Sequence, residues 1–260
     1  MLDQTFSADN FRKIYDLQNR RGHNVDKLFF ADVAQKNIAI TAKSSAVRQA
    51  RKEFKLDPVI ANQQALDVLK SELGVLRDER DNLIDTAIDQ TAALSANYRI
   101  QLNPTSGPNG MALYVLPSEP CAYFIGKQLQ YNISHLYKLR AGNKRAIISQ
   151  LRDALNHSFN QFVVRTDVSQ FYESINRDLL LREMEQDQIL SWASKRFIKQ
   201  CLASYGSGSG QTSGLPRGLG VSAYLAELYM RSVDREIMQI PDLTYYARYV
   251  DDIIAVFSPS

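Results

Sequence analysis

Residues 244–257, TYYARYVDDIIAVF, predict two short strands that meet at a tight acidic turn. Aromatic and β-branched residues flank Tyr249-Val250-Asp251-Asp252 on both sides, and this composition is typical of strands inside a sheet. Two adjacent ionised carboxylates repel each other and are costly to remove from water. An acidic turn that simply remains in water explains the dipeptide alone equally well, so a functional assignment needs a second feature.

A second aspartate supplies that feature. Residues 162–168, FVVRTDV, predict a short buried strand that carries Asp167 near its end. If the strands are neighbours, Asp167 and Asp251 converge at one end of the sheet. Convergent carboxylates are the hard oxygen ligands that Mg²⁺ prefers, and a cation would relieve their repulsion. The pattern therefore predicts a site for two Mg²⁺ ions that hold the attacking and leaving oxygens of a phosphoryl transfer.

The rest of the chain mixes helices with these strands. Residues from about 8 to 97 are predominantly helical in pattern, and the leucine-rich part from 62 to 98 predicts a long amphipathic helix packed on the protein's own core. Coiled-coil or partner-helix packing is the alternative. Segments 177–203 and 222–237 predict further helices. Helices that interrupt an antiparallel sheet indicate an α+β fold.

Turn residues divide the chain into two predicted domains. Residues 103–110 are dense in Asn, Pro, Ser and Gly, which places a boundary between a helical N-terminal extension (1–102) and the main domain (103–260).

The glycine-rich residues 206–210 predict a flexible linker. No Gly-Lys-Ser/Thr ending follows them, which excludes a P-loop. Gly218 and Gly220 would allow a close backbone approach to a nucleotide.

Composition excludes several other protein classes. The chain is 45% hydrophobic with a formal charge of +3, too small by itself to demonstrate nucleic-acid binding. No 18-residue apolar run and no signal-peptide layout is present, so we expect a cytoplasmic protein without a membrane partner. Cys121 and Cys201 belong to no ligand-spaced motif and predict buried, reduced thiols. The histidines give no zinc pattern; they are His23, His135 and His157.

Three segments in order resemble the motifs of reverse transcriptases. Residues 249–252 (YVDD) resemble the aspartate box of that family, and residues 167–175 (DVSQFYESI) resemble its first aspartate motif. Between them, residues 214–223 (GLPRGLGVSA) are similar to its substrate-binding motif. The resemblance covers roughly residues 130–257, and it implies a right-hand polymerase palm and fingers. It is closest to the bacterial reverse transcriptases associated with antiphage defence, which commonly carry a helical N-terminal extension.

Roles for individual residues follow from this resemblance. It implies that Asp167, the Val168 carbonyl and Asp251 bind metal, with Asp252 as a supporting carboxylate. Tyr172 matches the bulky aromatic that lies beneath the sugar and excludes a 2′-hydroxyl. RNA-templated RNA polymerases usually place a second aspartate there, so Tyr172 favours dNTPs.

The substrate-binding motif departs from the family at two positions. Many relatives have Gln where Arg217 stands and Pro where Ala223 stands. Arg217, next to Gly218, could supply charge to a triphosphate or to a primer phosphate.

A basic run lies upstream of Asp167. It comprises Lys138, Arg140, Lys144 and Arg145. Alone, such a run is typical of a solvated surface. The resemblance places it where reverse transcriptases carry the fingers residues that hold the incoming triphosphate. Arg145 best matches the arginine of the family, and Lys138 is a further candidate for the dNTP site.

The sequence thus predicts an RNA-directed DNA polymerase that uses RNA or DNA as template and primer and serves antiviral defence. A non-coding RNA or a second protein chain are further candidate partners. Two alternatives stay open: a polymerase-like scaffold that binds nucleic acid or protein, and untemplated nucleotide addition. The chain ends at Ser260, whereas the resemblance implies a further palm segment, a primer grip and a thumb. We expect a longer protein or another chain to supply these parts, and poor primer-template grip without them.

Overall fold

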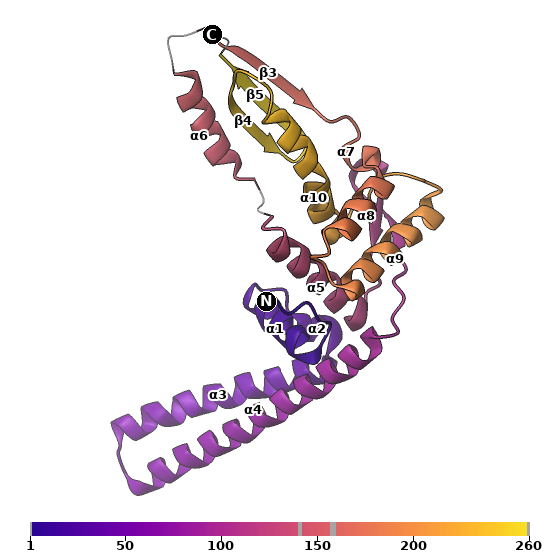
Figure 1. The fold of residues 1–260 in the computed structure, drawn as a ribbon. Helices are drawn as coiled ribbons and strands as arrows, with labels where there is room; N and C mark the ends of the chain where they lie inside the picture. Colours follow the sequence, from indigo (N-terminus) through magenta and orange to yellow (C-terminus); the bar gives the residue numbers. More distant parts are fainter. Residues whose placement is uncertain (1, 140–141, 157–159, 259–260) are drawn as a thin grey trace. The chain divides into compact units, whose positions relative to one another are not determined.

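The computed structural model of the chain describes residues 2–139, 142–156 and 160–258 (Figure 1). The chain divides into two compact units. The helical unit comprises Phe6–Tyr98 and Glu119–Ile125, and the sheet unit comprises Met1–Thr5, Arg99–Ser118 and Gly126–Ser260. The domain boundary expected between residues 102 and 103 stays a prediction.

The helical unit contains four helices, which confirms the predicted helical character of this region. They are α1 (Ala8–Arg20), α2 (Val25–Phe29), α3 (Ala31–Leu56) and α4 (Ile60–Ser95). Helix α1 begins where the Ser7 side chain accepts a hydrogen bond from the backbone N–H of Asn10, which satisfies a free donor of the first turn. The ring of Phe11 stacks on that of Phe124 at 5.3 Å within the same unit. Aromatic packing of this kind anchors the unit's core.

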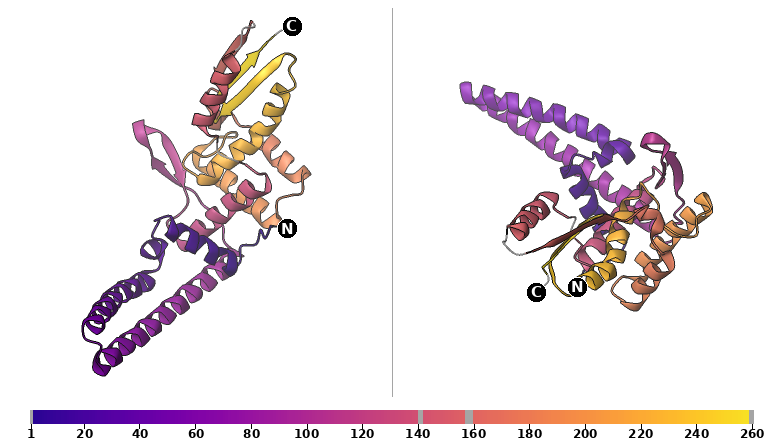
Figure 2. Two further views of the ribbon diagram at one scale, coloured as in Figure 1. Left: turned by 90° about the vertical axis from the view of Figure 1, so that its left-hand side faces the viewer. Right: turned by 90° about the horizontal axis from the view of Figure 1, so that it is seen from above.

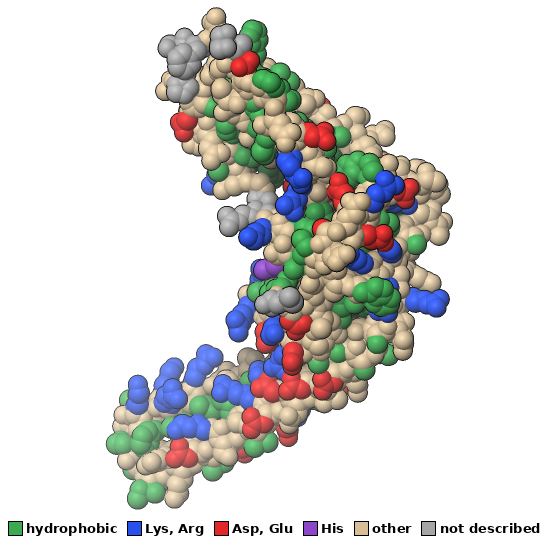
Figure 3. Space-filling view, in the orientation of Figure 1, with side chains coloured by type: hydrophobic (Ala, Val, Ile, Leu, Met, Phe, Trp, Pro, Cys, Tyr) green, Lys and Arg blue, Asp and Glu red, His purple; other side chains and the backbone are tan. Residues whose placement is uncertain are grey.

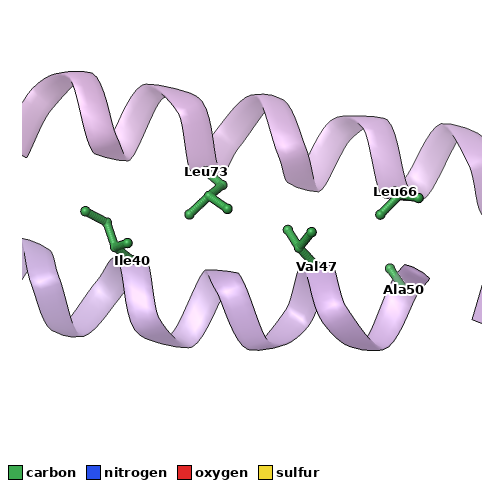
Figure 4. Close-up of a cluster of buried hydrophobic side chains, with 5 residues drawn as sticks. All are labelled: Ile40, Val47, Ala50, Leu66 and Leu73. Atoms are coloured by element: carbon green, nitrogen blue, oxygen red, sulfur yellow. The ribbon is translucent and has the colours of Figure 1, made fainter. Parts of the chain in front are cut away.

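Helices α3 and α4 run antiparallel and form a two-helix arm (Figures 1 and 2). The core of the arm consists of Ile40, Val47, Ala50, Leu66 and Leu73 (Figure 4). Ile40 and Val47 are seven residues apart, as are Leu66 and Leu73, which is the repeat of helices packed side by side in a coiled coil. Lys43 also reaches across to Glu72 at 2.8 Å. The leucine pattern thus pairs two helices of the same chain.

The sheet unit has an α+β architecture, as predicted. Its elements are β1 (Asn103–Ser106), η1 (Pro108–Gly110), β2 (Ala112–Val115), α5 (Pro120–Leu136, whose first turns belong to the helical unit), α6 (Lys144–Leu155), β3 (Phe162–Asp167), α7 (Phe171–Ser174), α8 (Arg177–Gln186), α9 (Trp192–Ser209), α10 (Gly220–Ile237), β4 (Leu243–Tyr249) and β5 (Asp252–Phe257). Strands β1 and β2 form an antiparallel hairpin. The second sheet has the order β3-β5-β4, and all its pairings are antiparallel.

Strand β4 carries a helix on each face (Figures 1 and 2). The hydroxyl of Tyr245 donates to the backbone carbonyl of Ile147 on α6 at 3.0 Å. On the other face, the hydroxyl of Tyr246 donates to Asp234 on α10 at 2.6 Å. Successive residues of a strand point to opposite faces, so α6 and α10 cover opposite sides of the sheet.

Strand β3 is not buried, contrary to prediction. All six of its residues are exposed, including Phe162 at 63%. The reason is its position at the edge of the sheet: the contacts of α6 and α10 with the sheet gather on β4, at the opposite edge. The buried residues lie in the central strand β5, at Ile253, Ala255 and Val256.

The predicted helix over 177–203 is interrupted, and the predicted linker over 206–210 is wrong. Helix α8 ends at Gln186, and α9 begins at Trp192 and continues through Gly206 to Ser209. Tyr205 fixes this glycine-rich end, because its ring contacts Tyr114 edge-on at 4.8 Å and lies under the Arg177 guanidinium at 4.8 Å. The helix stops at Gly210, whose φ of +71° suits a residue without a side chain.

Cys121 and Cys201 are free and buried, as predicted. Across the described part of the chain, every helix is too short or too polar to span a bilayer.

Candidate functional site

The acidic turn and the first aspartate strand meet in register. Asp167 is the direct cross-strand partner of Asp252, and Tyr249 pairs with Asp252 from the other side. The backbone N–H of Val168 donates to the carbonyl of Asp251 at 3.2 Å. Opposed residues of an antiparallel pair point to the same face with Cβ atoms about 5 Å apart. The predicted adjacency of the two aspartate strands is therefore confirmed.

The carboxylates match a Mg²⁺ site in chemistry and backbone position, but their side chains are not gathered. Among the described residues, no three Asp, Glu, His or Cys side chains converge closely enough to hold a metal ion. Asp252 instead lies 3.5 Å from the guanidinium of Arg165, and its side chain is 49% exposed. Asp167 is exposed as well. The donors are hard oxygens on adjoining strand ends, and binding would require them to turn toward one another.

A cavity of about 560 Å³ lies beside the acidic turn. Each of the three motif segments contributes to its wall, through Tyr172, Gly220 and the turn residues Tyr249 and Val250. Gln130, Ser134, Tyr224 and Glu227 add polar groups. Concave sites with a few convergent polar groups are where small ligands bind, so this cavity is the candidate nucleotide site.

Tyr172 lies half-buried in the wall of this cavity, on the short helix α7. Its ring packs edge-on against Phe171 at 5.3 Å, and the Arg217 guanidinium lies 5.3 Å from its ring centroid. Burial raises the pKa of Tyr172 above its usual value. The side chain is therefore a neutral ring held from two sides.

Arg217 forms a two-point ion pair with Glu173. Its Nε donates to one carboxylate oxygen at 2.6 Å and its Nη2 to the other at 2.9 Å. This is the bidentate geometry in which arginine and carboxylate bind most strongly. The hydrogen bond from Arg217 lowers the pKa of Glu173. The predicted phosphate-binding arginine thus braces helix α7 in this structure.

The loop that carries Arg217 is tied to α7 and to strand β2. The backbone N–H of Leu215 donates to the carbonyl of Tyr172 at 2.7 Å, and that of Tyr114 donates to the carbonyl of Arg217 at 2.7 Å. Gly214 has a φ of +81°, and a Cβ there would lie 2.7 Å from the Cα of Glu173. Gly218 likewise lies against Tyr114, at 3.2 Å for a Cβ. Both glycines permit close packing of the protein's own backbone.

The basic run upstream contributes an unexpected residue. The Lys144 ammonium lies 5.7 Å from the ring centroid of Tyr249, within the range of a cation–π interaction. Arg145, the predicted match to the family arginine, is exposed in the first turn of α6, and Lys138 is exposed after α5. Arg140 lies outside the described residues. The structure therefore brings Lys144, not Arg145, to the acidic turn.

A buried arginine behind the acidic turn was missed by sequence reasoning. Arg248 exposes 6% of its side chain and pairs with Asp234 and Glu227 of α10, each at 2.8 Å. Its Nη1 also donates to the carbonyl of Val250 in the turn at 2.9 Å. Burial alone would lower the pKa of Arg248, but its hydrogen bonds to Asp234 and Glu227 outweigh that effect and raise it. A charged residue in an otherwise apolar strand was the available signal.

One comparison with known proteins gives a match. The family model described as reverse transcriptase (RNA-dependent DNA polymerase) matches residues 119–259, just over half of the chain. No curated protein matches the sequence.

Proposed function

The chain belongs to the reverse transcriptase family, and from this premise we propose that it is a Mg²⁺-dependent RNA-directed DNA polymerase that adds dNTPs to a 3′-hydroxyl. The observation that carries the proposal is the cross-strand pairing of Asp167 with Asp252 beside the Tyr172 cavity. Template and primer would be RNA or DNA. The resemblance to defence-associated relatives supports a role in bacterial antiviral defence.

Each acidic residue has a proposed role. Asp167, Asp251 and the carbonyl of Val168 would hold two Mg²⁺ ions, and Asp252 would support them from the adjoining strand position. When bound, the metal would supply charge neutralisation at the attacking hydroxyl and the leaving pyrophosphate. The protein itself contributes position, because the pairing of β3 with β5 sets Asp167 opposite Asp252, next to the turn residue Asp251.

Tyr172 is proposed to exclude ribonucleotides. Tyr172→Ala is expected to lower the preference for dNTP over NTP about 10- to 100-fold, because the ring no longer occupies the space of a 2′-hydroxyl. The ratio of kcat/KM for dNTP and NTP in single-nucleotide incorporation measures the effect. Tyr172→Phe keeps the ring and should keep the preference. Unchanged discrimination in Tyr172→Ala would refute the steric role.

Arg217 is proposed to act on the nucleotide through Tyr172 and Glu173, since Glu173 occupies its Nε and Nη2. Arg217→Gln and Glu173→Gln are each expected to raise KM for dNTP about fivefold, and the double variant no further than either. The reason is that each single change already breaks the same ion pair. A double-mutant cycle on KM measures this. If Arg217 held a phosphate directly, Arg217→Gln would cost far more than Glu173→Gln, and the two effects would add.

Arg145 and Lys138 remain proposed contacts of the triphosphate, together with Gly218 in the substrate-binding loop. Lys144 joins them as a candidate because of its position on Tyr249. An exposed cation near a site raises the affinity of that site for a phosphate mainly through its charge.

A polymerase-like scaffold is the second candidate. The observation that favours it is the salt bridge between Asp252 and Arg165, together with the ungathered carboxylates of the described residues. A scaffold would bind nucleic acid or a partner chain without turnover. Incorporation of a nucleotide distinguishes the two, and dependence on the template distinguishes polymerisation from untemplated addition.

A further inference from the structure

The arm of the helical unit carries a basic face on α3. Four cationic side chains form it: Arg48, Arg51, Lys52 and Lys55. Their spacing of three, four and seven residues places them on one side of a helix. All four are exposed. At 1.5 Å per residue they span about 10 Å along the helix axis.

The charge of this face is not used within the arm. Lys36 and Lys43, also on α3, form ion pairs with Glu79 and Glu72 of α4. Within the described chain, none of the four residues of the basic face forms an ion pair. The nearby carboxylate of Glu53 accepts a hydrogen bond from Gln49 at 2.9 Å, on another side of the helix. Lys and Arg side chains gather visibly on the arm in Figure 3.

The same side of α3 continues with small residues. Thr41, Ser44 and Ser45 lie in line with the basic face one and two turns earlier. Their side chains are short, and the hydroxyls of Thr41 and Ser45 donate to backbone carbonyls of α3 itself. The apolar side of α3, at Ile40 and Val47, is already packed against α4. The exposed side of α3 therefore offers charge, together with two exposed large apolar residues, Ile38 and Leu56.

We propose that the basic face of α3 binds the sugar–phosphate backbone of a nucleic acid. The match is one of charge density: duplex nucleic acid carries one negative charge per about 1.7 Å of its axis, so a stretch of about 10 Å presents several phosphates to four cations. A lone carboxylate or phosphate could not engage all four. The proposed contact is with phosphates, which fix the position of the nucleic acid and carry no sequence information directly. It adds a binding surface to the proposed function and does not depend on catalysis.

The test measures binding and its salt dependence on the full chain. The probes are a fluorescein-labelled RNA stem-loop and a DNA stem-loop of the same sequence, followed by fluorescence anisotropy between about 50 and 200 mM salt. The variant Arg48→Gln/Lys52→Gln removes two charges from the face. The matched control Lys70→Gln/Arg77→Gln removes two exposed charges from α4 of the same arm. Thermal unfolding verifies that both variants fold like the parent.

Two phosphate contacts account for a slope of about 1.8 in log K against log salt, at about 0.9 each. For Arg48→Gln/Lys52→Gln we expect the magnitude of this slope to fall by about 1.8. For the control variant we expect the slope of the parent protein. Arg51→Gln/Lys55→Gln should repeat the loss. Equal losses in variant and control, or no loss in either, would overturn the proposal.

Because Leu56 and Ile60 near the end of the arm are also exposed, vesicles of anionic lipid are the rival probe. Binding that responds to the variant on vesicles alone would overturn it too. A stronger effect on RNA than on DNA identifies which backbone is preferred.

Discussion

Asp251→Asn is expected to reduce single-nucleotide incorporation about 1000-fold. The substitution keeps the size of the side chain and removes the charge that a divalent cation needs. Metal-assisted stabilisation of a transferring phosphoryl group is worth several kcal/mol, and about 4 kcal/mol corresponds to about three orders of magnitude in rate. Incorporation of one dNTP into a labelled primer, quenched at successive times, measures it.

The matched control for this substitution is Asp242→Asn. Asp242 precedes β4 in the same unit and is exposed, so its variant should retain the parent rate. Asp251→Asn should also unfold at the same temperature as the parent or higher, because it relieves repulsion with Asp252. A parent-like rate in Asp251→Asn would remove this residue from the reaction. A lowered unfolding temperature would attribute the lost activity to the fold.

Arg248→Met is expected to lower the free energy of unfolding by about 3 kcal/mol. Methionine fills much of the space, but Glu227 and Asp234 then lose the cation that neutralises them. Breaking one partner of a buried ion-pair network typically costs several kcal/mol. The side chains of Glu227 and Asp234 are still 29% and 19% exposed. Water therefore solvates them in part, and we expect a loss near the lower end of that cost. A urea titration followed by circular dichroism measures the loss.

The control for the buried network is Arg165→Met, on the same sheet. The Arg165 side chain is 76% exposed and its pair with Asp252 is long, at 3.5 Å. Exposed pairs of this kind contribute about 0–1 kcal/mol. Adding Glu227→Gln and Asp234→Asn to Arg248→Met should recover part of the loss, because no unpaired charge then remains. Equal stability of Arg248→Met and Arg165→Met would contradict the assigned role of Arg248.

The strands and the acidic turn could be predicted because their signals are local. The apolar runs on either side of Asp251-Asp252 fix two strands, and a tight turn leaves them only antiparallel pairing. Strands β3 and β5 lie far apart in the chain, so the register that sets Asp167 opposite Asp252 could not be read from the sequence. The apolar pattern of residues 162–168 could not indicate how deeply the strand is buried. Phe162 and its neighbours are apolar, yet β3 lies at the edge of the sheet and is exposed.

The errors concern contacts between distant parts of the chain. A glycine-serine tract is flexible by composition, but Tyr205 binds this one to Tyr114 and Arg177. The partners of Arg248 lie on α10, and its burial depends on how that helix packs on β4. The coupling of Arg217 to Glu173 has the same origin. The sequence shows which residues stand at 205, 217 and 248, but their partners depend on how distant elements pack.

The most direct test of the polymerase assignment is templated incorporation by the longest available form of the protein. A primer annealed to each of four RNA templates, which differ only in the next base, is offered all four dNTPs one at a time with Mg²⁺. We expect only the complementary dNTP to be added on each template, and Asp167→Asn to abolish the addition. Incorporation that ignores the template base, or that survives in Asp167→Asn, would contradict it.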